Sequence, residues 1–263
     1  MKKIMTLGAV LIAGAAFAVT SSTIVGYNTA TVPAGKQIAL TVSFENVAGG
    51  SIDITNLLSC ANHNANASFG SADQIWRWDT TNGRWDQYYY SKYNKRQGTV
   101  DGWCTKASEG KSLTTATIPA GETFFYRNGG SAAQTLVLSG AIKAFSAEPS
   151  YSIPAGKQQL IGYPWPVAMP IADFAKFQVN PVSNASFGSA DQIWRWDTVA
   201  GAWKQYYYSK YNKRQGTVDG WCTKESGGTA VTSDSVNPGE GFFFRNGGSA
   251  TQTISFVYPI PVE

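Results

Sequence analysis

The sequence carries a long internal duplication, and this feature constrains the fold more than any other. Residues 66–80 recur letter for letter at 184–198, and residues 87–106 recur without change at 205–224. The displacement is 118 positions in both cases, which is far longer than the period of a solenoid repeat. The duplication therefore predicts two tandem domains rather than successive turns of one superhelix.

Looser similarity extends the duplication in both directions. Two further pairs of segments match, 124–130 with 242–248 at an offset of 118 and 33–36 with 154–157 at an offset of 121. The change of offset places a three-residue insertion in the first copy. We therefore expect one β module at 26–145 and a second at 146–263, each large enough to bury a core of its own.

The aromatic region of each copy is typical of a β-hairpin. Residues 75–79 alternate between two faces, residues 80–83 end in glycine, and residues 84–90 return. In the second copy the turn is 198–201, and Gly201 keeps the position where a positive φ is expected.

Other segments favour strands bounded by tight turns. Residues 123–127 and 134–138 flank Asn128-Gly129-Gly130, a pattern that predicts a second hairpin. The Pro-Ala-Gly segments that begin at Pro33 and Pro119 are typical of turns that introduce strands.

Glycine is abundant, with 27 residues, and no long segment has a helical period. Only a short helical turn is expected, at 171–177. The sequence therefore predicts an all-β protein made of two tandem, near-identical antiparallel β-sandwich or barrel-like modules.

The N-terminus has the parts of an export signal. Lys2 and Lys3 precede an apolar stretch at 4–17, and Ala16-Phe17-Ala18 forms a small-x-small cleavage site. We expect a signal peptide at 1–18, an N-terminal segment at 19–25, and a mature chain that is secreted or displayed at a cell surface. The stretch is too short for a membrane helix, so no membrane span is expected in the mature chain.

The charge of the chain is small. The net charge of +4 falls to +2 when Lys2 and Lys3 leave with the signal (4 − 2), and only 14% of residues are charged. Such a chain has no strong long-range field, so neither nucleic acid nor an anionic membrane is expected as a partner.

Several motifs of the second copy follow one another in a recognisable order. They are Pro154-Ala-Gly, Ile161-Gly-Tyr-Pro-Trp165, Ile193-Trp-Arg-Trp196 and Pro238-Gly-Glu-Gly-Phe-Phe-Phe244. This order resembles the tandem aromatic-rich β modules of secreted bacterial surface proteins, and the resemblance implies surface display rather than catalysis. The first copy departs from the pattern, because Leu40-Thr-Val-Ser-Phe44 stands where the Tyr-Pro-Trp strand is expected. Identical ligand binding by the two copies is therefore not implied.

The sequence offers little for catalysis. His63 is the only histidine and lies outside the duplicated segments, so we interpret it as a solvated loop histidine. This excludes a duplicated Ser-His-Asp site and a histidine-rich zinc site. Asp79 and Asp101 border turns, where aspartate commonly caps backbone amides. We expect no enzymatic activity, no cofactor and no metal, and a hydrolase acting on polysaccharide is the most distant hypothesis.

The duplicated aromatic residues are the candidate ligand-binding residues. Because neighbouring strand residues point to opposite faces, residues 88–90 must place rings on both faces. One face can form the core, and the other is either covered by a second sheet or exposed to a sugar or a protein partner. The candidates are Trp76, Trp78, Trp85, Tyr88, Tyr90 and Tyr93, with their copies Trp194, Trp196, Trp203, Tyr206, Tyr208 and Tyr211.

Basic and aromatic residues alternate in 92–96 and in the copy at 210–214. Such a pattern can bind single-stranded nucleic acid, but the export signal and the small net charge favour a solvated loop. An acidic polysaccharide remains open as a partner of these lysines.

The chain has three cysteines, an odd number. Cys104 and Cys222 occupy equivalent positions and Cys60 has no counterpart, so a disulfide inside each module is excluded. The pairings Cys60–Cys104, Cys60–Cys222 and Cys104–Cys222 stay open, as do buried free thiols.

Two hypotheses for function follow. The first is a secreted, non-catalytic structural or surface-interaction protein, with self-association through the aromatic β modules. The alternative is a bivalent carbohydrate-binding protein that binds polysaccharide through the aromatic hairpins.

Overall fold

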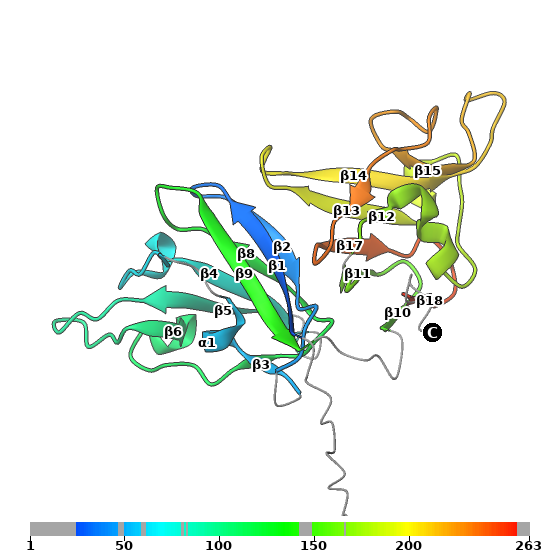
Figure 1. Cartoon of the computed structure of the whole chain (residues 1–263). Coiled ribbons are helices and arrows are strands. Elements are labelled where there is room, and N and C mark those ends of the chain that lie inside the picture. The colour runs from blue at the N-terminus through cyan, green and yellow to red at the C-terminus, as the bar shows by residue number, and fades with distance from the viewer. Residues whose placement is uncertain are drawn as a thin grey trace, which may run out of the picture.

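The computed structural model describes residues 25–46, 50–58, 62–79, 82, 84–141, 149–165 and 167–256. The predicted signal peptide at 1–18 lies outside the described residues, as does the segment 142–148 where the boundary between the two modules is expected. The described chain is mostly β, and its antiparallel sheets are open rather than closed into barrels (Figure 1).

The N-terminal half consists of strands β1 to β9. A five-stranded sheet has the order β2 (Gln37–Thr41), β8 (Thr123–Arg127), β4 (Gln74–Asp79), β5 (Arg84–Ser91) and β6 (Gly102–Thr105). Two smaller sheets pair β1 (Val25–Val32) with β9 (Gln134–Ala141), and β3 (Ile52–Asp53) with β7 (Thr117–Ile118). The helical elements are α1 (Ile54–Leu57), η1 (Phe69–Ser71) and η2 (Lys106–Ser108).

The C-terminal half consists of β10 to β18 and has the same strand order. Its five-stranded sheet contains β11 (Gln158–Gly162), β17 (Gly241–Arg245), β13 (Gln192–Asp197), β14 (Ala202–Ser209) and β15 (Gly220–Thr223). Its two smaller sheets pair β10 (Ser150–Ile153) with β18 (Gln252–Ser255), and β12 (Met169–Pro170) with β16 (Ser235–Val236). The helical elements are η3 (Ile171–Phe177) and η4 (Phe187–Ser189).

Each half has its own hydrophobic core on one face of its five-stranded sheet. In the N-terminal half, Ile75 and Tyr88 are register partners on this face and pack with Leu136 of β9 and Ile118 of β7. The two small sheets and α1 therefore cover the large sheet, which gives a sandwich-like arrangement. Tyr89, the next residue along β5, packs on the opposite face, as the alternation of strand side chains requires.

The predicted aromatic hairpin is confirmed in both halves. Strand β4 pairs with β5 and β13 pairs with β14, each with the Trp-Arg-Trp segment facing the returning strand. Gly201 has φ of +67° and donates its backbone N–H to the Asp197 carbonyl at 2.8 Å, as expected for the turn.

The other turn predictions are also confirmed. The amides of Lys36 and Glu122 bond to the carbonyls of Pro33 and Pro119 at 3.1 and 3.2 Å, so each Pro-Ala-Gly turn introduces a strand. Residues 171–177 form a short 3-10 helix, as the sequence predicts.

The predicted hairpin of residues 123–127 and 134–138 is wrong. Strand β8 pairs with β2 and β4, whereas β9 pairs with β1, so the two strands belong to different sheets. Gly129 lies against the Ala72 carbonyl, where a Cβ atom would overlap it, and the Gly129 amide bonds to Asp73 at 2.9 Å. Asn128 donates to the carbonyls of Val32 and Ala132 at 3.0 and 2.8 Å. These contacts lead the chain from one sheet to the other instead of back on itself.

None of the helices in the described ranges is both long and apolar enough to cross a membrane.

Candidate functional site: the junction between the two halves

The candidate site is the face of each large sheet that lies opposite its core. In the N-terminal half, the alternation along β4 and β5 places Trp76, Trp78 and Trp85 together on this face. The rings of Trp78 and Trp85 have centroids 5.1 Å apart and pack edge to face, and Phe125 of β8 continues the row 5.7 Å from Trp85. Edge-to-face packing of this kind adds specificity to the burial of large apolar surfaces.

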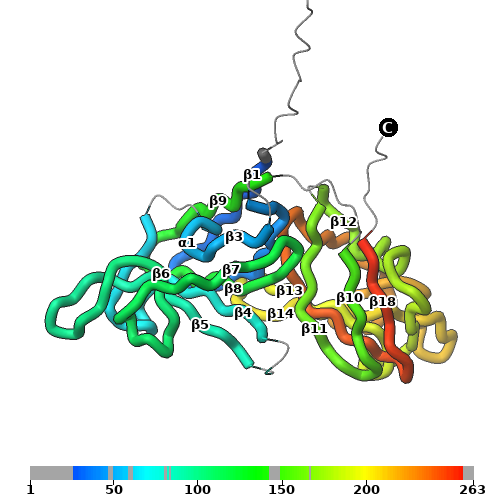
Figure 2. The backbone as a smooth tube through the Cα atoms, turned by 90° about the horizontal axis from the view of Figure 1, so that it is seen from below, coloured from blue at the N-terminus to red at the C-terminus, as the bar shows by residue number. Residues whose placement is uncertain are grey.

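The aromatic row passes from one half to the other. The Phe125 ring lies 5.9 Å from Trp203, nearly perpendicular to it, and 6.4 Å from Phe243. In the C-terminal half, Trp203 packs in turn on Phe243 and on Trp196 at 5.4 and 5.0 Å. Strand β2 contacts β13 and β17, and β8 contacts β11, at the centre of the molecule (Figure 2). The aromatic faces of the two large sheets thus meet at the junction.

Polar contacts fix the junction further. The Trp196 indole N–H donates to the Gln37 carbonyl at 2.6 Å, and the Thr41 amide donates to the Gly239 carbonyl at 2.8 Å. On the other side, the Tyr151 hydroxyl donates to the Gly121 carbonyl at 2.9 Å. Burial raises the pKa of Tyr151 to about 12, so this hydroxyl stays protonated and remains a donor.

The centre of the junction is complementary in shape. Thr41 and Thr123 are partners on neighbouring strands of the N-terminal half, both are buried, and their hydroxyl oxygens lie 3.1 Å apart. The equivalent positions of the C-terminal half are Gly162 and Gly241, which are also partners. A Cβ atom on Gly162 would overlap Thr41, and one on Gly241 would overlap the Thr123 methyl group. Two threonines of one half therefore fill the space that two glycines of the other half leave open.

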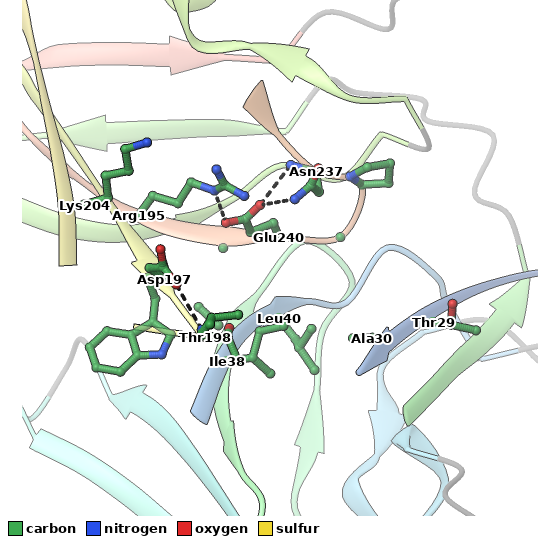
Figure 3. Close-up of a pocket in the computed structure, with 16 residues that line it drawn as sticks. Thr29, Ala30, Ile38, Leu40, Arg195, Asp197, Thr198, Lys204, Asn237 and Glu240 are labelled. Atoms are coloured by element: carbon green, nitrogen blue, oxygen red, sulfur yellow. Dashed lines mark hydrogen bonds and ion pairs between the residues drawn. The ribbon is translucent and has the colours of Figure 1, made fainter. Parts of the chain in front are cut away.

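A cleft lies on each side of this centre, at equivalent positions of the two copies. The first, of about 470 Å³, is bordered by β1 and β2 of the N-terminal half and by β13 and β17 of the C-terminal half (Figure 3). The second, of about 600 Å³, is bordered by β4 and β5 and, across the junction, by β10 and β11. The two clefts therefore lie at the two edges of one junction, and equivalent residues of the two halves line them.

Each cleft contains an arginine–glutamate pair. Arg195 bonds to Glu240 in the first cleft, and Arg77 bonds to Glu122 in the second, where a second guanidinium nitrogen lies 2.8 Å from the carboxylate. The hydrogen bond with Glu122 raises the pKa of Arg77 above its usual value. Burial acts to lower the pKa of Arg195, but the hydrogen bond and charge of Glu240 outweigh it, so that pKa is raised too. Both arginines are thus fixed cations that are already paired.

The clefts differ where the two copies diverge. Lys204 stands at the position that is equivalent to Asp86 of the first copy. It forms an ion pair of 2.6 Å with Asp234, which also accepts a hydrogen bond of 2.7 Å from the Tyr206 hydroxyl. Burial acts to raise the pKa of Asp234, but these two donors outweigh it and hold the pKa below its usual value. The C-terminal half therefore keeps this carboxylate ionised as a structural partner.

Comparisons with protein-family models, with curated proteins and with solved structures give no match for this chain.

The structure divides the predicted ligand-binding residues into three groups. Tyr88 and Tyr206 are buried in the cores, which is the first of the two positions that the sequence left open for these rings. Tyr90 and Tyr208 are half-buried and pack on Trp103 and Trp221, each at 5.5 Å. The tryptophans Trp76, Trp78, Trp85, Trp194, Trp196 and Trp203 lie partly exposed along the aromatic faces, and Tyr93 and Tyr211 are largely exposed in loops.

The prediction of a solvated His63 is wrong. Its side chain is 11% exposed, and its ring packs 4.7 Å from Tyr90 and 5.6 Å from Trp103. The Nδ1 atom lies 3.4 Å from the carboxylate of Asp73, which is fully buried. The ring closes one side of this carboxylate, a packing role that the isolated histidine in the sequence does not reveal.

Buried carboxylates at the equivalent positions Asp73 and Asp191 join loops in both halves. Asp191 accepts hydrogen bonds from the Val182 and Gly247 amides, both at 2.8 Å, and from the side chains of Gln178 and Gln252. Each of these two aspartates links two loops through hydrogen bonds to their backbone amides.

Cys104 and Cys222 are buried free thiols, so the pairing Cys104–Cys222 is not formed. Cys60 lies outside the described residues. Within the part of the chain that the structure describes, no group of three His, Cys, Asp or Glu residues could hold a metal ion.

The threonine–glycine contact is the part of the junction that the sequence analysis missed. A signal was present at one position, because Gly241 stands at the place of Thr123 between otherwise similar segments. Thr41 and Gly162 lie in segments that differ at most positions, and only the sheet register pairs them with Thr123 and Gly241.

Proposed function

We propose that the chain is an exported, non-catalytic structural or surface-interaction protein. It consists of two tandem, near-identical antiparallel β-sandwich modules, 26–145 and 146–263, which dock through their aromatic faces into one rigid unit. The rigid unit, rather than a pocket with reactive groups, is what this protein would supply at a cell surface.

The observation that carries the proposal is the fit of Thr41 and Thr123 against Gly162 and Gly241. Two copies with threonine at both positions would clash, and two copies with glycine would leave a void at the centre. The copies have thus diverged at the residues that make their contact complementary. Such divergence is expected of modules whose mutual docking is part of their function.

The aromatic residues support the same interpretation. The ring of Phe125 contacts Trp203 and Phe243 of the other half, and Trp196 has its indole N–H bonded across the junction. These rings stabilise the contact between the modules and are not free to stack on a sugar. This favours the structural hypothesis over the alternative in which the aromatic hairpins bind polysaccharide.

The carboxylates support a non-catalytic role. The repeated Asp73 and Asp191 are fully buried, and Glu122 and Glu240 are engaged by arginines. A general acid or base needs a carboxyl group that can reach a substrate, which the two buried aspartates lack.

The test uses residues 1–263 expressed in a bacterium with an export pathway. We expect the protein in the exported fraction, with the mass of a chain that begins at Val19. We also expect it to release no reducing ends from a panel of neutral and acidic polysaccharides. A chain that keeps Met1 and stays inside the cell would contradict the export. Polysaccharide turnover that is abolished by Asp79→Ala or Asp101→Ala, in variants of unchanged stability, would contradict the non-catalytic role.

A further inference from the structure

Two letter-identical loops project from the ends of the molecule and take no part in the junction. They join β5 to β6 and β14 to β15, and each carries an exposed tyrosine, with Tyr93 60% and Tyr211 61% exposed. Three exposed cations flank each tyrosine in the sequence, and they are Lys92, Lys95 and Arg96 in the first loop and Lys210, Lys213 and Arg214 in the second.

The loops hold a fixed shape through their own hydrogen bonds. In the first loop the Tyr93 amide donates to Asp101 at 2.8 Å, and the Thr99 hydroxyl donates to the Lys92 carbonyl at 2.6 Å. The second loop repeats both bonds with the same lengths, from the Tyr211 amide and the Thr217 hydroxyl. The exposed side chains are therefore presented on an ordered backbone, which lowers the entropy lost on binding.

Among the described residues, none of the six lysines and arginines of the two loops forms an ion pair, although ion pairs occur elsewhere at the surface. Neighbouring surface positions have diverged between the copies, as Asp86 and Lys204 illustrate, whereas every residue of the loops is retained. Folding alone does not require Lys95 or Arg96 at a solvated position. Their retention in both copies therefore indicates that a function other than folding requires them.

We infer that each loop is a binding site for an acidic polysaccharide. The two lysines and the arginine would pair with carboxylate or sulfate groups, and the exposed tyrosine would pack its ring against an adjacent sugar face. Each loop offers one exposed aromatic ring, whereas single-stranded nucleic acid is bound by successive rings on which successive bases stack. A charged sugar polymer is therefore the occupant that the loop chemistry fits best.

The position of the loops determines how a polymer is engaged. Figures 1 and 2 both place the β5–β6 loop and the β14–β15 loop at opposite ends of the molecule. A rigid protein with two sites that face away from each other binds two separate polymer chains rather than two segments of the same chain. The inference is thus that this protein cross-links acidic polysaccharide, an activity that goes beyond the docking of its own modules.

The experiment measures binding and cross-linking with the mature chain. Immobilised polygalacturonate, dextran sulfate and neutral dextran report affinity, and light scattering of the soluble polymers reports cross-linking. We expect binding to a carboxylated or sulfated polymer that weakens with salt, no binding to neutral dextran, and a rise in scattering. The two acidic polymers separate carboxylate from sulfate recognition, and either result supports the inference.

Loop variants assign the effect to the two sites. K92Q/K95Q/R96Q or K210Q/K213Q/R214Q alone should keep affinity within about twofold but abolish the scattering increase, because one site remains. The variant that carries all six substitutions should bind at least about tenfold more weakly, which corresponds to about 1.4 kcal/mol. Thermal unfolding of each variant should be unchanged, since the loop backbone is held by Asp101 and Thr99 and their copies.

A matched control removes three exposed cations outside the loops. R84Q/K157Q/K176Q lowers the net charge equally and should leave both binding and cross-linking intact. An equal loss of binding in this control would overturn the inference, because net charge alone would then explain the affinity. Absence of binding to both acidic polymers, or tighter binding to single-stranded DNA than to either, would also overturn it.

Discussion

Thr123 of β8 places its methyl group in the space that any side chain at Gly241 of β17 would occupy. The two residues hold equivalent positions in the two copies of the duplicated sequence. Their contact therefore records how one half of the chain has adapted to the other. It also makes the junction sensitive to the smallest possible change, the addition of one methyl group.

Gly241→Ala should lower the free energy of unfolding by about 1–3 kcal/mol, the usual range for overpacking a closed site. Urea denaturation followed by tryptophan fluorescence measures the change. Gly188→Ala is the matched control, because a Cβ atom there meets no other atom within 4 Å. Combining Gly241→Ala with Thr123→Ser should restore much of the loss, since serine keeps the hydroxyl and removes the methyl group. A double variant no more stable than Gly241→Ala would show that the overlap is not the cause.

Trp196→Phe should lower the free energy of unfolding by about 0.5–1.5 kcal/mol beyond the loss seen for Trp78→Phe. The substitution removes the indole N–H that donates to Gln37 across the junction at 2.6 Å. Trp78 is the equivalent residue of the N-terminal half and also packs on a tryptophan, so its variant controls for the smaller ring. Equal losses for the two variants would remove the role assigned to this hydrogen bond.

The buried carboxylates should give the two halves opposite responses to acid. Burial acts to raise the pKa of Asp73, but the neighbouring side chains of His63 and Tyr126 and hydrogen bonds from two backbone amides outweigh it, so the pKa is lowered. Burial dominates at Asp191 and its pKa is raised. A lowered pKa gives stability that is present at neutral pH and is lost as the pH falls from about 4 through the folded-state pKa. A raised pKa gives stability that is present at low pH and is lost as the pH rises through the folded-state pKa.

Asp73→Asn should therefore destabilise the protein most at pH 7, with a difference from the wild type that shrinks below about pH 4. For Asp191→Asn the loss of unfolding free energy relative to the wild type should be smaller at pH 7 and should grow as the pH falls. Urea unfolding of both variants between pH 3 and pH 7 measures the two differences. Parallel curves for the variants would contradict the opposite directions of the two pKa shifts.

The sequence predicts the parts of this fold that depend on neighbouring residues. The period-two pattern of residues 75–90 predicts the hairpin and the division of Tyr88 and Tyr89 between the two faces. The Pro-Ala-Gly segments predict turns because their backbone preferences are local.

Features that depend on distant contacts were not predictable in this way. A glycine pair after β8 indicates a hairpin, but Asp73 and Asn128 direct the chain to another sheet. The pattern of the tryptophans showed that a second aromatic face exists, yet it could not show that the other half of the chain covers much of it. His63 is isolated in the sequence, and only the fold places it between Tyr90 and Asp73.

Cys104 and Cys222 should react slowly with alkylating reagents in the native protein. Both thiols are buried, and burial raises the pKa of each, so little reactive thiolate forms at pH 8. Mass spectrometry of a Cys60→Ser variant after brief iodoacetamide treatment should find both thiols unmodified, and both should react in guanidinium chloride. Rapid labelling of the native variant would contradict the buried positions.

Small-angle X-ray scattering of residues 19–263 in dilute solution tests whether the two halves form one rigid body through their aromatic faces. We expect a scattering curve that agrees with the docked arrangement of Figure 1, with a distance distribution that has a single maximum. A distribution with two maxima, as given by two separate bodies on a flexible connection, would contradict the claim.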